Sequence, residues 1–531
     1  MIHRKPLVAF TFLAAVLFIV VFRAPVLLHE DVLGGGDVNR GIYWMQKWND
    51  PALFQNDPIS DYLASTQPPG MVAVYRVLSF AIDPVTASGL LAIPLFLITA
   101  VFLYLLVLRL SNPAGASFAL FLFMGYEGAA HIFSSSTGSD FMPPLFCAML
   151  FFLVANRWIA FAVTLTLSSF FYPAITLVCA TVAGVWRLRE QPNRTLLEFA
   201  KTAAILIPAG VTLVLMGLLF DNDWGAILSR AEMTALPAFG PGGDTPFVNL
   251  TIWEWLSGFR SGFAFEPVLM PLFALSLAVI LIGDRKSGKS RNFFGLVLLV
   301  CLAWFALAHL LAIRIGFPTN YVRFSLPILL CAWCGAALGK MLVLRKANQR
   351  QIVFRYALIV AVILFLFAPH WTRGYDDFRP LHKLHRFLRT LPKDDLIMGS
   401  PNLLEGAPAL TARKLLVSRQ AQDGLHRKYL TLYQQRMEDF LAGYYATSRD
   451  TFCDVVNKYG VAVVVVDRRD FDPTYSATVD AYSSPYREMV QRYLDAPDNF
   501  YLLNESAGQR LFSDNDRFVI RPDCVGKTAT P

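Results

Sequence analysis

The stretch Asp37-Val-Asn-Arg-Gly-Ile-Tyr-Trp-Met45 decides how this sequence is interpreted, because it lies in the first polar loop of an otherwise hydrophobic chain. The same loop carries Glu30, Asp31 and the glycine run 34–36, and it directly follows the first hydrophobic segment. Two interpretations stay open: a loop with a chemical role, held at a membrane surface, or an ordinary polar loop with solvated carboxylates. In the first, the glycine run is expected to act as a hinge.

The composition indicates a membrane protein with several spanning segments. Of the 531 residues, 55% are hydrophobic and 16% are charged, and the mean hydropathy is +0.46, whereas soluble proteins carry about 25% charged residues. The apolar residues come in blocks long enough to cross a bilayer. The net charge of +8 does not indicate a nucleic-acid partner, because the basic residues lie largely in short loops between apolar segments, where they set topology.

The basic residues predict the topology of the chain. Arg4 and Lys5 place the N-terminus in the cytoplasm, and the first apolar run is interpreted as a retained helix rather than a cleaved signal peptide. The first loop, 29–84, then lies outside, and about eleven spans are expected. The predicted spans cover residues 6–28, 85–108, 114–133, 141–155, 158–186 (two short crossings), 200–219, 262–282, 293–313, 323–344 and 352–369.

The segment 158–186 is predicted to cross the membrane twice. It is apolar throughout, yet both of its flanks are basic and therefore belong on the cytoplasmic side. Two short helices that turn near residues 168–173 satisfy both flanks. Helices broken at membrane depth are tolerated where they line a cavity or are covered by protein.

The last part of the chain, 370–531, is predicted to be an extracytoplasmic α/β domain. It is polar, and helical patterns at 381–391 and 427–445 accompany a β-branched run, 461–466, which suits a buried central strand. The expected fold class is therefore a polytopic α-helical membrane protein, residues 1–369, with a C-terminal periplasmic α/β domain.

Two of the seven cysteines, Cys453 and Cys524, lie in this last part. In an oxidising compartment they can form a disulfide that joins the end of the domain to its middle. The alternative is two free buried thiols.

Ionisable and polar residues gather near the predicted outer ends of the spans, where each is a functional candidate because such groups are unfavourable in or beside a membrane. They are Glu30, Asp31, Asp37 and Arg40 in the first loop, Glu127, His131 and Asp140 around the second, and Arg314, Tyr321 and Arg323 around the last. Arg314 and Arg323 flank one short loop, which suits binding of a lipid phosphate, although Arg323 can also serve as an interfacial anchor. Glu127 and His131, four residues apart, can instead satisfy each other.

These residues suit the transfer of a sugar from a lipid phosphate to a hydroxyl group. That reaction needs a base for the acceptor proton and positive charge on the leaving phosphate. Asp37 is the expected base and Arg323 the expected phosphate clamp. Glu30 or Asp31 can instead hold a divalent metal ion with Asp140, and no ligand spacing here is specific for a metal.

The chain resembles the glycosyltransferase C superfamily, integral enzymes that use polyprenyl-phosphate-linked sugars. The resemblance rests on an acidic first outer loop, short broken spans, an arginine before a late helix and a C-terminal outer domain. Its motifs are residues 36–43, 56–62 leading to 68–70, 171–173 and 320–327. It implies that Asp37 is the catalytic acid of the first loop and that Arg323 contacts the lipid phosphate. The chain departs from the superfamily pattern because no second acidic residue follows Asp37 closely, and Asp31 is a possible substitute.

Three functions follow from these features. The first is a glycosyltransferase of the bacterial inner membrane, which passes a sugar from a polyprenyl phosphate to a glycan, lipid or protein on the outer face. The second is a transporter or flippase of lipid-linked glycans, which internal repeats would favour, and none is visible. The third is a non-catalytic protein of envelope polysaccharide assembly, with the C-terminal part as a binding module.

Overall fold

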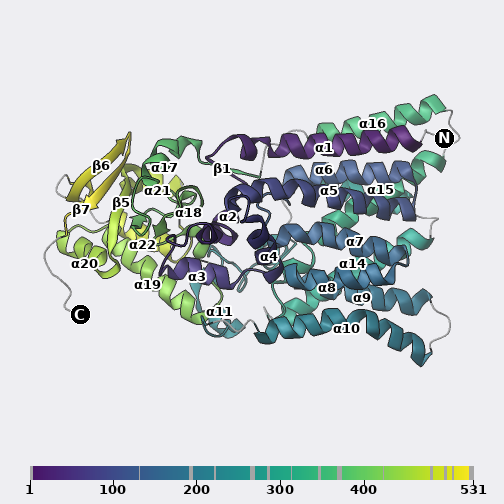
Figure 1. Ribbon diagram of the computed structural model, residues 1–531, viewed down its shortest axis with the longest axis horizontal. Coiled ribbons are helices and arrows are strands. Elements are labelled where there is room, and N and C mark those ends of the chain that lie inside the picture. Colours follow the sequence, from purple (N-terminus) through teal and green to yellow (C-terminus); the bar gives the residue numbers. More distant parts are fainter. Residues whose placement is uncertain are drawn as a thin grey trace.

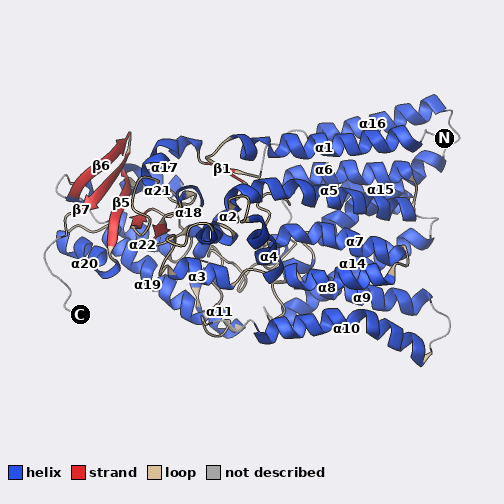
Figure 2. Ribbon diagram, viewed as in Figure 1, coloured by secondary structure: helices blue, strands red, loops and turns tan. Residues whose placement is uncertain are grey.

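The computed structural model describes residues 4–524 except 131, 191–194, 220–222, 264–269, 284–287, 312–313, 345–348, 368–373, 423, 479–481, 496–498 and 505–506. Long helices run side by side at one end of the molecule, and a sheet with shorter helices forms the other end (Figure 1). Figure 2 shows that the strands are confined to this second end, apart from the short β1 near its border with the helices. The first described residues, at the start of α1, lie at the far end of the helices, and the last described residues lie at the end that holds the sheet.

The long helices follow the predicted apolar segments. They are α1 (Arg4–Leu28), α5 (Pro84–Leu110), α6 (Pro113–Ala130), α7 (Met142–Val154), α8 (Trp158–Phe171), α9 (Pro173–Glu190), α10 (Leu196–Leu219), α13 (Met270–Gly283), α14 (Gly288–Leu311), α15 (Ser325–Leu344) and α16 (Gln349–Phe367). Among the described residues, five segments are long and apolar enough to cross a membrane: Pro6–Leu28, Pro84–Leu110, Phe199–Gly217, Ser290–Leu311 and Pro318–Leu342. The multi-pass character is confirmed, and the count of about eleven spans stays a prediction. Parts of four predicted spans, at 131, 264–269, 312–313 and 368–369, lie outside the described residues.

The expected break within 158–186 is present. Helix α8 ends at Phe171, Tyr172 adopts a non-helical backbone (φ −150°, ψ 83°), and α9 begins at Pro173. Proline suits this position because the first residue of a helix has no need of its N–H group.

Small residues bring α6 and α15 close together. A Cβ atom on Gly335 would lie 2.6 Å from the Ala119 Cα, and one on Gly339 would lie 2.5 Å from the Gly115 Cα. Small side chains let two helix backbones approach in this way inside a membrane protein. The contact lies in the second half of α15, a helix that begins two residues after Arg323.

The sheet of the C-terminal part is mixed. Its order is β4 (Lys414–Leu415), β3 (Leu396–Gly399), β5 (Val461–Asp467), β7 (Arg517–Pro522) and β6 (Gly508–Asp514), with β3 parallel to β4 and β5, and β7 antiparallel to β5 and β6. The expected central strand is confirmed, since β5 is buried along almost its whole length. The expected helices are present as α17 (His382–Leu388) and α19 (Arg427–Tyr444), and α18 (Ala407–Thr411), α20 (Arg449–Tyr459), α21 (Pro473–Thr478) and α22 (Tyr486–Asp495) complete this part.

The first loop packs against the C-terminal part, which the sequence did not predict. Its short strand β1 (Val32–Leu33) pairs antiparallel with β2 (Asp376–Asp377). The rest of the loop forms α2 (Val38–Gly41), η1 (Tyr43–Trp48), α3 (Pro58–Ser65) and α4 (Pro69–Leu78). From α3, the ring of Tyr62 stacks on that of Tyr429 in α19, with 3.5 Å between their centroids. The loop is therefore enclosed between the long helices and the sheet.

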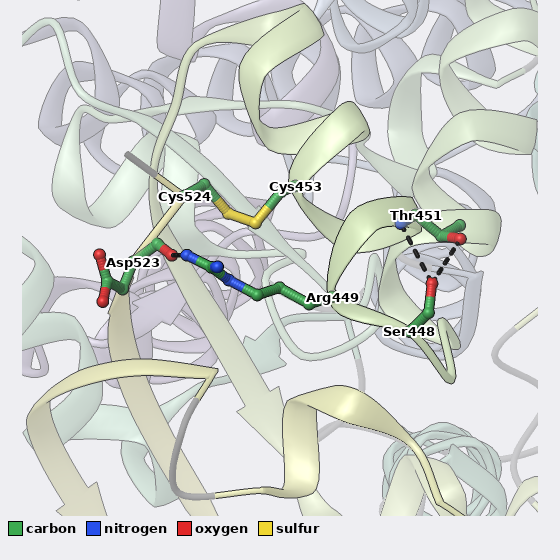
Figure 3. Close-up of a disulfide and its surroundings, with 6 residues drawn as sticks. All are labelled: Ser448, Arg449, Thr451, Cys453, Asp523 and Cys524. Atoms are coloured by element: carbon green, nitrogen blue, oxygen red, sulfur yellow. Dashed lines mark hydrogen bonds between the residues drawn. A yellow bond between two sulfur atoms is a disulfide. The ribbon is translucent and has the colours of Figure 1, made fainter. Parts of the chain in front are cut away.

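A disulfide joins Cys453 in α20 to Cys524, with 5.3 Å between the two Cα atoms (Figure 3). Beside it, the Arg449 guanidinium donates a hydrogen bond of 2.8 Å to the Asp523 backbone oxygen. The Ser448 hydroxyl caps α20 by accepting the Thr451 N–H at 3.2 Å. These contacts hold the segment that follows β7 against α20.

Replacing both Cys453 and Cys524 by serine is expected to lower the free energy of unfolding by about 4 kcal/mol, because the bridge closes a 71-residue loop and limits the unfolded chain. Thermal unfolding of the purified chain, with and without dithiothreitol, measures the effect. The reductant should lower the unfolding temperature of the wild type and leave that of the double variant unchanged. An equal response of both proteins would contradict a stabilising disulfide.

Candidate functional site

Asp37 stands at the centre of the candidate site. It is the residue before α2, its side chain is exposed, and it makes no capping hydrogen bond to that helix. The carboxylate is therefore not used by the local fold. The charge of Asp37 acts on three groups from distant parts of the chain: Asp140, Arg323 and Asp376. The structure thus brings together the two residues expected to be base and phosphate clamp.

The glycines before Asp37 fix its position by close packing. A Cβ atom on Gly34 would lie 1.9 Å from the Ser134 backbone oxygen, and Gly35 has a φ of +98°, which favours glycine. A Cβ atom on Gly36 would lie 2.6 Å from the Gln420 amide nitrogen. The expectation of a hinge is therefore replaced by a packed turn that presses the first loop against the loop after α6.

Gly34→Ala is expected to destabilise the protein by at least about 3 kcal/mol, because the new methyl group would overlap a backbone oxygen that cannot rotate away. The yield and unfolding temperature of the purified variant measure this. Gly184→Ala, in α9, is the matched control, since its Cβ atom would meet nothing within 4 Å. Equal stability of the two variants would show that the turn can shift to accommodate the added methyl group, and would contradict the prediction.

Asp140 is buried beside Asp37 and belongs to η2 (Gly138–Phe141), which precedes α7. Its carboxylate accepts hydrogen bonds from the Thr137 N–H at 3.1 Å and the Ser135 hydroxyl at 3.2 Å. Burial, followed by the negative charge of Asp37, raises the pKa of Asp140 to about 7, although these hydrogen bonds oppose the shift. The two carboxylates therefore repel each other, and an added positive charge between them would be stabilised.

Arg323 supplies the positive side of the site. Its guanidinium carbon lies 3.7 Å from the ring centre of Phe259 and 4.9 Å from that of Phe324. The negative charge of Asp37 stabilises the guanidinium, and the Tyr172 ring packs near Phe324 with 6.4 Å between centroids. Rings on either side hold an arginine in a fixed orientation while its N–H groups remain able to bind an anion.

The other predicted site residues are not all placed beside Asp37. Tyr321 is fully buried, its hydroxyl donates a 2.7 Å hydrogen bond to the Ile315 backbone oxygen, and its ring stacks on Trp304, so it supports the turn before Arg323. Arg314 is exposed in that turn, and Arg40 lies in α2, one turn from Asp37. Glu127 belongs to α6, and its side chain, like the whole of His131, lies outside the described residues.

The C-terminal part contributes acidic groups that sequence reasoning missed. Burial, Glu405 and Asp37 together raise the pKa of Asp376, in β2, to about 6, and Arg419 opposes the shift. The Glu405 carboxylate accepts a 2.6 Å hydrogen bond from Gln420, the side chain that meets Gly36. A two-residue strand carries no periodic signal, so no pattern could have assigned Asp376 to this site.

Glu30 and Asp31 point away from Asp140, toward α17. Asp31 is buried; its carboxylate is hydrogen-bonded to His382 Nδ1, and its other oxygen lies 3.5 Å from His385 Nδ1. Glu30 accepts a hydrogen bond of 3.1 Å from Arg389. Among the described residues, the group of three side chains whose atoms are close enough to share one metal ion is Glu30, Asp31 and His382, so the structure groups the two carboxylates with His382 and not with Asp140. The reason is the β1–β2 pairing, which turns these two carboxylates toward the C-terminal part.

Acid is expected to destabilise this junction through His385. Burial lowers the pKa of His385 to about 4; Asp31 opposes the shift, and Arg389 and His382 add to it. In the unfolded chain the imidazole takes up a proton near pH 6.5, whereas the folded state excludes it until about pH 4. Stability is therefore complete above pH 6.5 and falls by about 3 kcal/mol as the pH drops toward 4.

The test compares denaturant unfolding at pH 7 and pH 4 for the wild type, His385→Leu and His29→Leu, an exposed control. His385→Leu should lose about 3 kcal/mol less than the wild type on acidification, since the buried proton acceptor is gone. His29→Leu should follow the wild type. An identical loss in all three proteins would place the acid sensitivity elsewhere.

Comparison with solved structures reveals a shared fold. The oligosaccharyltransferase of Archaeoglobus fulgidus in its apo form aligns with a TM-score of 0.56 at 16% identity, over 88% of this chain and 70% of that chain. Its structure tethered to an acceptor peptide that contains the NVT sequon gives a TM-score of 0.53 at 14% identity, over 96% and 73% of the two chains. Its complex with an inhibitory peptide and a dolichol-phosphate gives 0.53 at 14% identity, over 90% and 72%.

No protein-family model matches the sequence, and comparison with curated proteins gives no match. The likeness is therefore one of fold, and it extends over most of the chain. The oligosaccharyltransferase is a glycosyltransferase of the C superfamily, so the resemblance seen in the sequence is confirmed at the level of the fold. The low identity makes this chain a divergent example of that architecture.

Proposed function

We propose that the protein is a glycosyltransferase of the bacterial inner membrane that transfers a sugar from a polyprenyl-phosphate donor to an acceptor on the outer face. The observation that carries the proposal is the electrostatic interaction of Asp37 with Arg323. These residues come from the first loop and from the turn before a late helix, and Asp37 makes no capping hydrogen bond to its own helix. A general base facing a phosphate clamp is the arrangement that this reaction needs.

The reaction follows from the chemistry of these two side chains. The acceptor hydroxyl gives its proton to Asp37 as its oxygen forms a bond to the anomeric carbon of the sugar. The bond between that carbon and the phosphate oxygen breaks at the same centre, and the polyprenyl phosphate leaves with the electron pair. Arg323 stabilises the negative charge that develops on the leaving phosphate, and the aromatic rings beside it keep water from weakening this interaction.

Asp37 and Asp140 carry oxygen ligands of the kind that a divalent cation takes, and the charge of Asp37 acts on Asp140. They would hold the ion, which would supply further positive charge to the donor phosphate. Asp140 takes up a proton with a pKa of about 7. Cation binding at this pair is therefore strongest above neutral pH.

The proposal includes an orientation of the protein in the membrane. With the N-terminus in the cytoplasm, the first loop and residues 370–531, proposed as a separate soluble domain, lie in the periplasm. The shared fold supports a lipid-linked donor, because the oligosaccharyltransferase structure holds a dolichol-phosphate. A glycan, lipid or protein acceptor suits the outer face. The other functions considered, a flippase of lipid-linked glycans or a non-catalytic assembly protein, need no carboxylate placed opposite an arginine.

The test is a transfer assay in detergent with purified protein and polyprenyl-phosphate sugars. The donor for it comes from mass spectrometry of a deletion strain, in which the unused lipid-linked sugar should accumulate. Formation of free polyprenyl phosphate together with a glycosylated acceptor is the expected result. Release of no lipid phosphate from the accumulated donor, by protein that is folded, would rule out the transferase.

A further inference from the structure

A cavity of about 230 Å³ lies in the C-terminal part, at the ends of β3 and β5. Ser400 directly follows β3, and Asp467 is the last residue of β5, so both parallel strands point their carboxyl ends at it. The chain leaves β3 toward β4 on one side and leaves β5 toward the paired strands β6 and β7 on the other. A crevice at such a divergence is the usual ligand site of a parallel sheet.

The lining of the cavity combines aromatic faces with hydrogen-bonding groups. Tyr445, Tyr475 and Tyr482 contribute rings, and Asp470, from the turn after β5, contributes a carboxylate whose Oδ2 accepts a 2.9 Å hydrogen bond from Tyr444. Burial, followed by the charge of Asp467, raises the pKa of Asp470 to about 7. This side chain can therefore both donate and accept hydrogen bonds near neutral pH.

The charges at the cavity balance one another. Arg469 forms a bidentate pair with Asp467, at 2.9 and 2.6 Å, and Arg517 donates to the same carboxylate at 3.3 Å. Asp377, from β2, lies at the rim and is itself paired with Arg379. A phosphate or carboxylate ligand would need unpaired positive charge, so this lining favours a neutral polar molecule.

One group of the lining has a hydrogen bond to spare. The Tyr482 side chain is more than nine-tenths buried, and among the described residues its hydroxyl has no hydrogen-bond partner of regular geometry. Ser400 and Tyr445 lie within reach of weak hydrogen bonds to this hydroxyl, and Asp470 acts on it electrostatically. A buried polar group in this state is unfavourable, and a ligand hydroxyl in the cavity would satisfy it.

We propose that this cavity binds one neutral monosaccharide unit of a glycan acceptor. Sugar rings present hydroxyl groups around an apolar face, and the cavity offers tyrosine rings together with donors and acceptors. Its volume is somewhat below the roughly 300–1,000 Å³ of pockets that take drug-sized ligands, which suits a single ring. The role of acceptor rests on the proposed function, whereas the affinity for a neutral sugar does not.

The place of the cavity fits an acceptor. Its rim residue Asp377 follows Asp376, which interacts electrostatically with Asp37, so one two-residue strand contributes to both sites. Successive side chains of a strand point to opposite faces. If one sugar unit of a glycan is bound in the cavity, the glycan would therefore have to extend past the edge of β2 for the adjacent sugar unit to reach Asp37.

Saturation-transfer NMR on the full-length protein in detergent tests the inference with glucose, galactose, mannose, rhamnose and N-acetylglucosamine, and with glucose 1-phosphate as the anionic counterpart. At least one neutral sugar should bind. Tyr482→Phe should weaken that binding about fivefold, because one hydrogen bond is lost. Tyr475→Ala should weaken it about tenfold through the loss of a ring contact.

Tyr459→Phe is the matched control, since the Tyr459 hydroxyl donates to Asp439 outside the cavity and the sugar affinity should not change. Binding of no neutral sugar, or unchanged binding in both cavity variants, would overturn the proposal. A preference for glucose 1-phosphate over every neutral sugar would overturn it as well. Unfolding temperatures equal to that of the wild type confirm that the variants are folded.

A separate readout distinguishes this inference from the proposed function. Asp37→Asn protein should bind the sugar as the wild type does, because Asp37 does not line the cavity. In the transfer assay, Tyr475→Ala should raise the KM for the acceptor with kcat unchanged. Sugar binding that depends on Tyr482 in a protein without transferase activity would uphold the cavity and reject the transferase.

Discussion

Asp37→Asn is expected to lower the rate of sugar transfer by about 10³-fold, because asparagine cannot accept the acceptor proton and a positioned base contributes roughly 10²–10⁴-fold. The exposed carboxylate has no capping role, so the variant should fold as the wild type does. The fall should appear in kcat, with the affinity for the lipid-linked donor almost unchanged. Release of polyprenyl phosphate from the purified donor measures the rate.

Asp61→Asn is the matched control for this experiment. Asp61 is an exposed carboxylate of α3 in the same loop. It lies 4.0 Å from Lys47, and no catalytic role is proposed for it. The control should transfer sugar at the wild-type rate. If both variants kept full activity, Asp37 could not be the base, and the buried Asp140 would be the next residue to replace.

Replacement of Arg323 by methionine is expected to lower kcat by about 10²- to 10³-fold. A loss of this size is typical when one hydrogen-bond donor to a developing anion is removed. Methionine retains a long apolar stem for packing against Phe259 and Phe324. Arg323→Lys should recover part of the rate, since the charge returns without the planar pair of N–H donors. The two variants together separate charge from geometry.

Arg76→Met is the control for Arg323. Arg76 is an exposed arginine of α4 that also lies against aromatic rings, 5.3 Å from the ring centre of Trp48 and 5.7 Å from that of Phe80. Its replacement removes a cation from the same side of the protein without touching Asp37. Equal losses in Arg76→Met and Arg323→Met would mean that general surface charge, and not a clamp, attracts the donor.

Strong and long patterns made much of the fold predictable. The apolar segments, the break before Pro173 and the buried strand that became β5 each carry a signal that extends over several residues. The roles of Asp37 and Arg323 were predicted from the chemistry that sugar transfer needs and from the resemblance, since nothing in their spacing relates them.

Contacts between short segments that are far apart in the chain could not be predicted from the sequence. The pairing of β1 with β2 rests on two residues in each strand, so it has no periodicity, yet it decides where Glu30 and Asp31 point. The glycine run suggested freedom of motion, whereas its lack of side chains serves the approach of Ser134. In both cases the deciding partner belongs to another element, and composition does not encode it.

The pairing of β1 with β2 also has a consequence for the biosynthesis of the protein. Val32 emerges from the ribosome early, whereas its partner Asp377 follows only after all the long helices have been made. The loop that carries Asp37 therefore stays incomplete throughout insertion of the chain into the membrane. Since domains form in the order of their synthesis, a nascent or truncated chain that ends before β2 lacks the partner strand of the loop that carries Asp37.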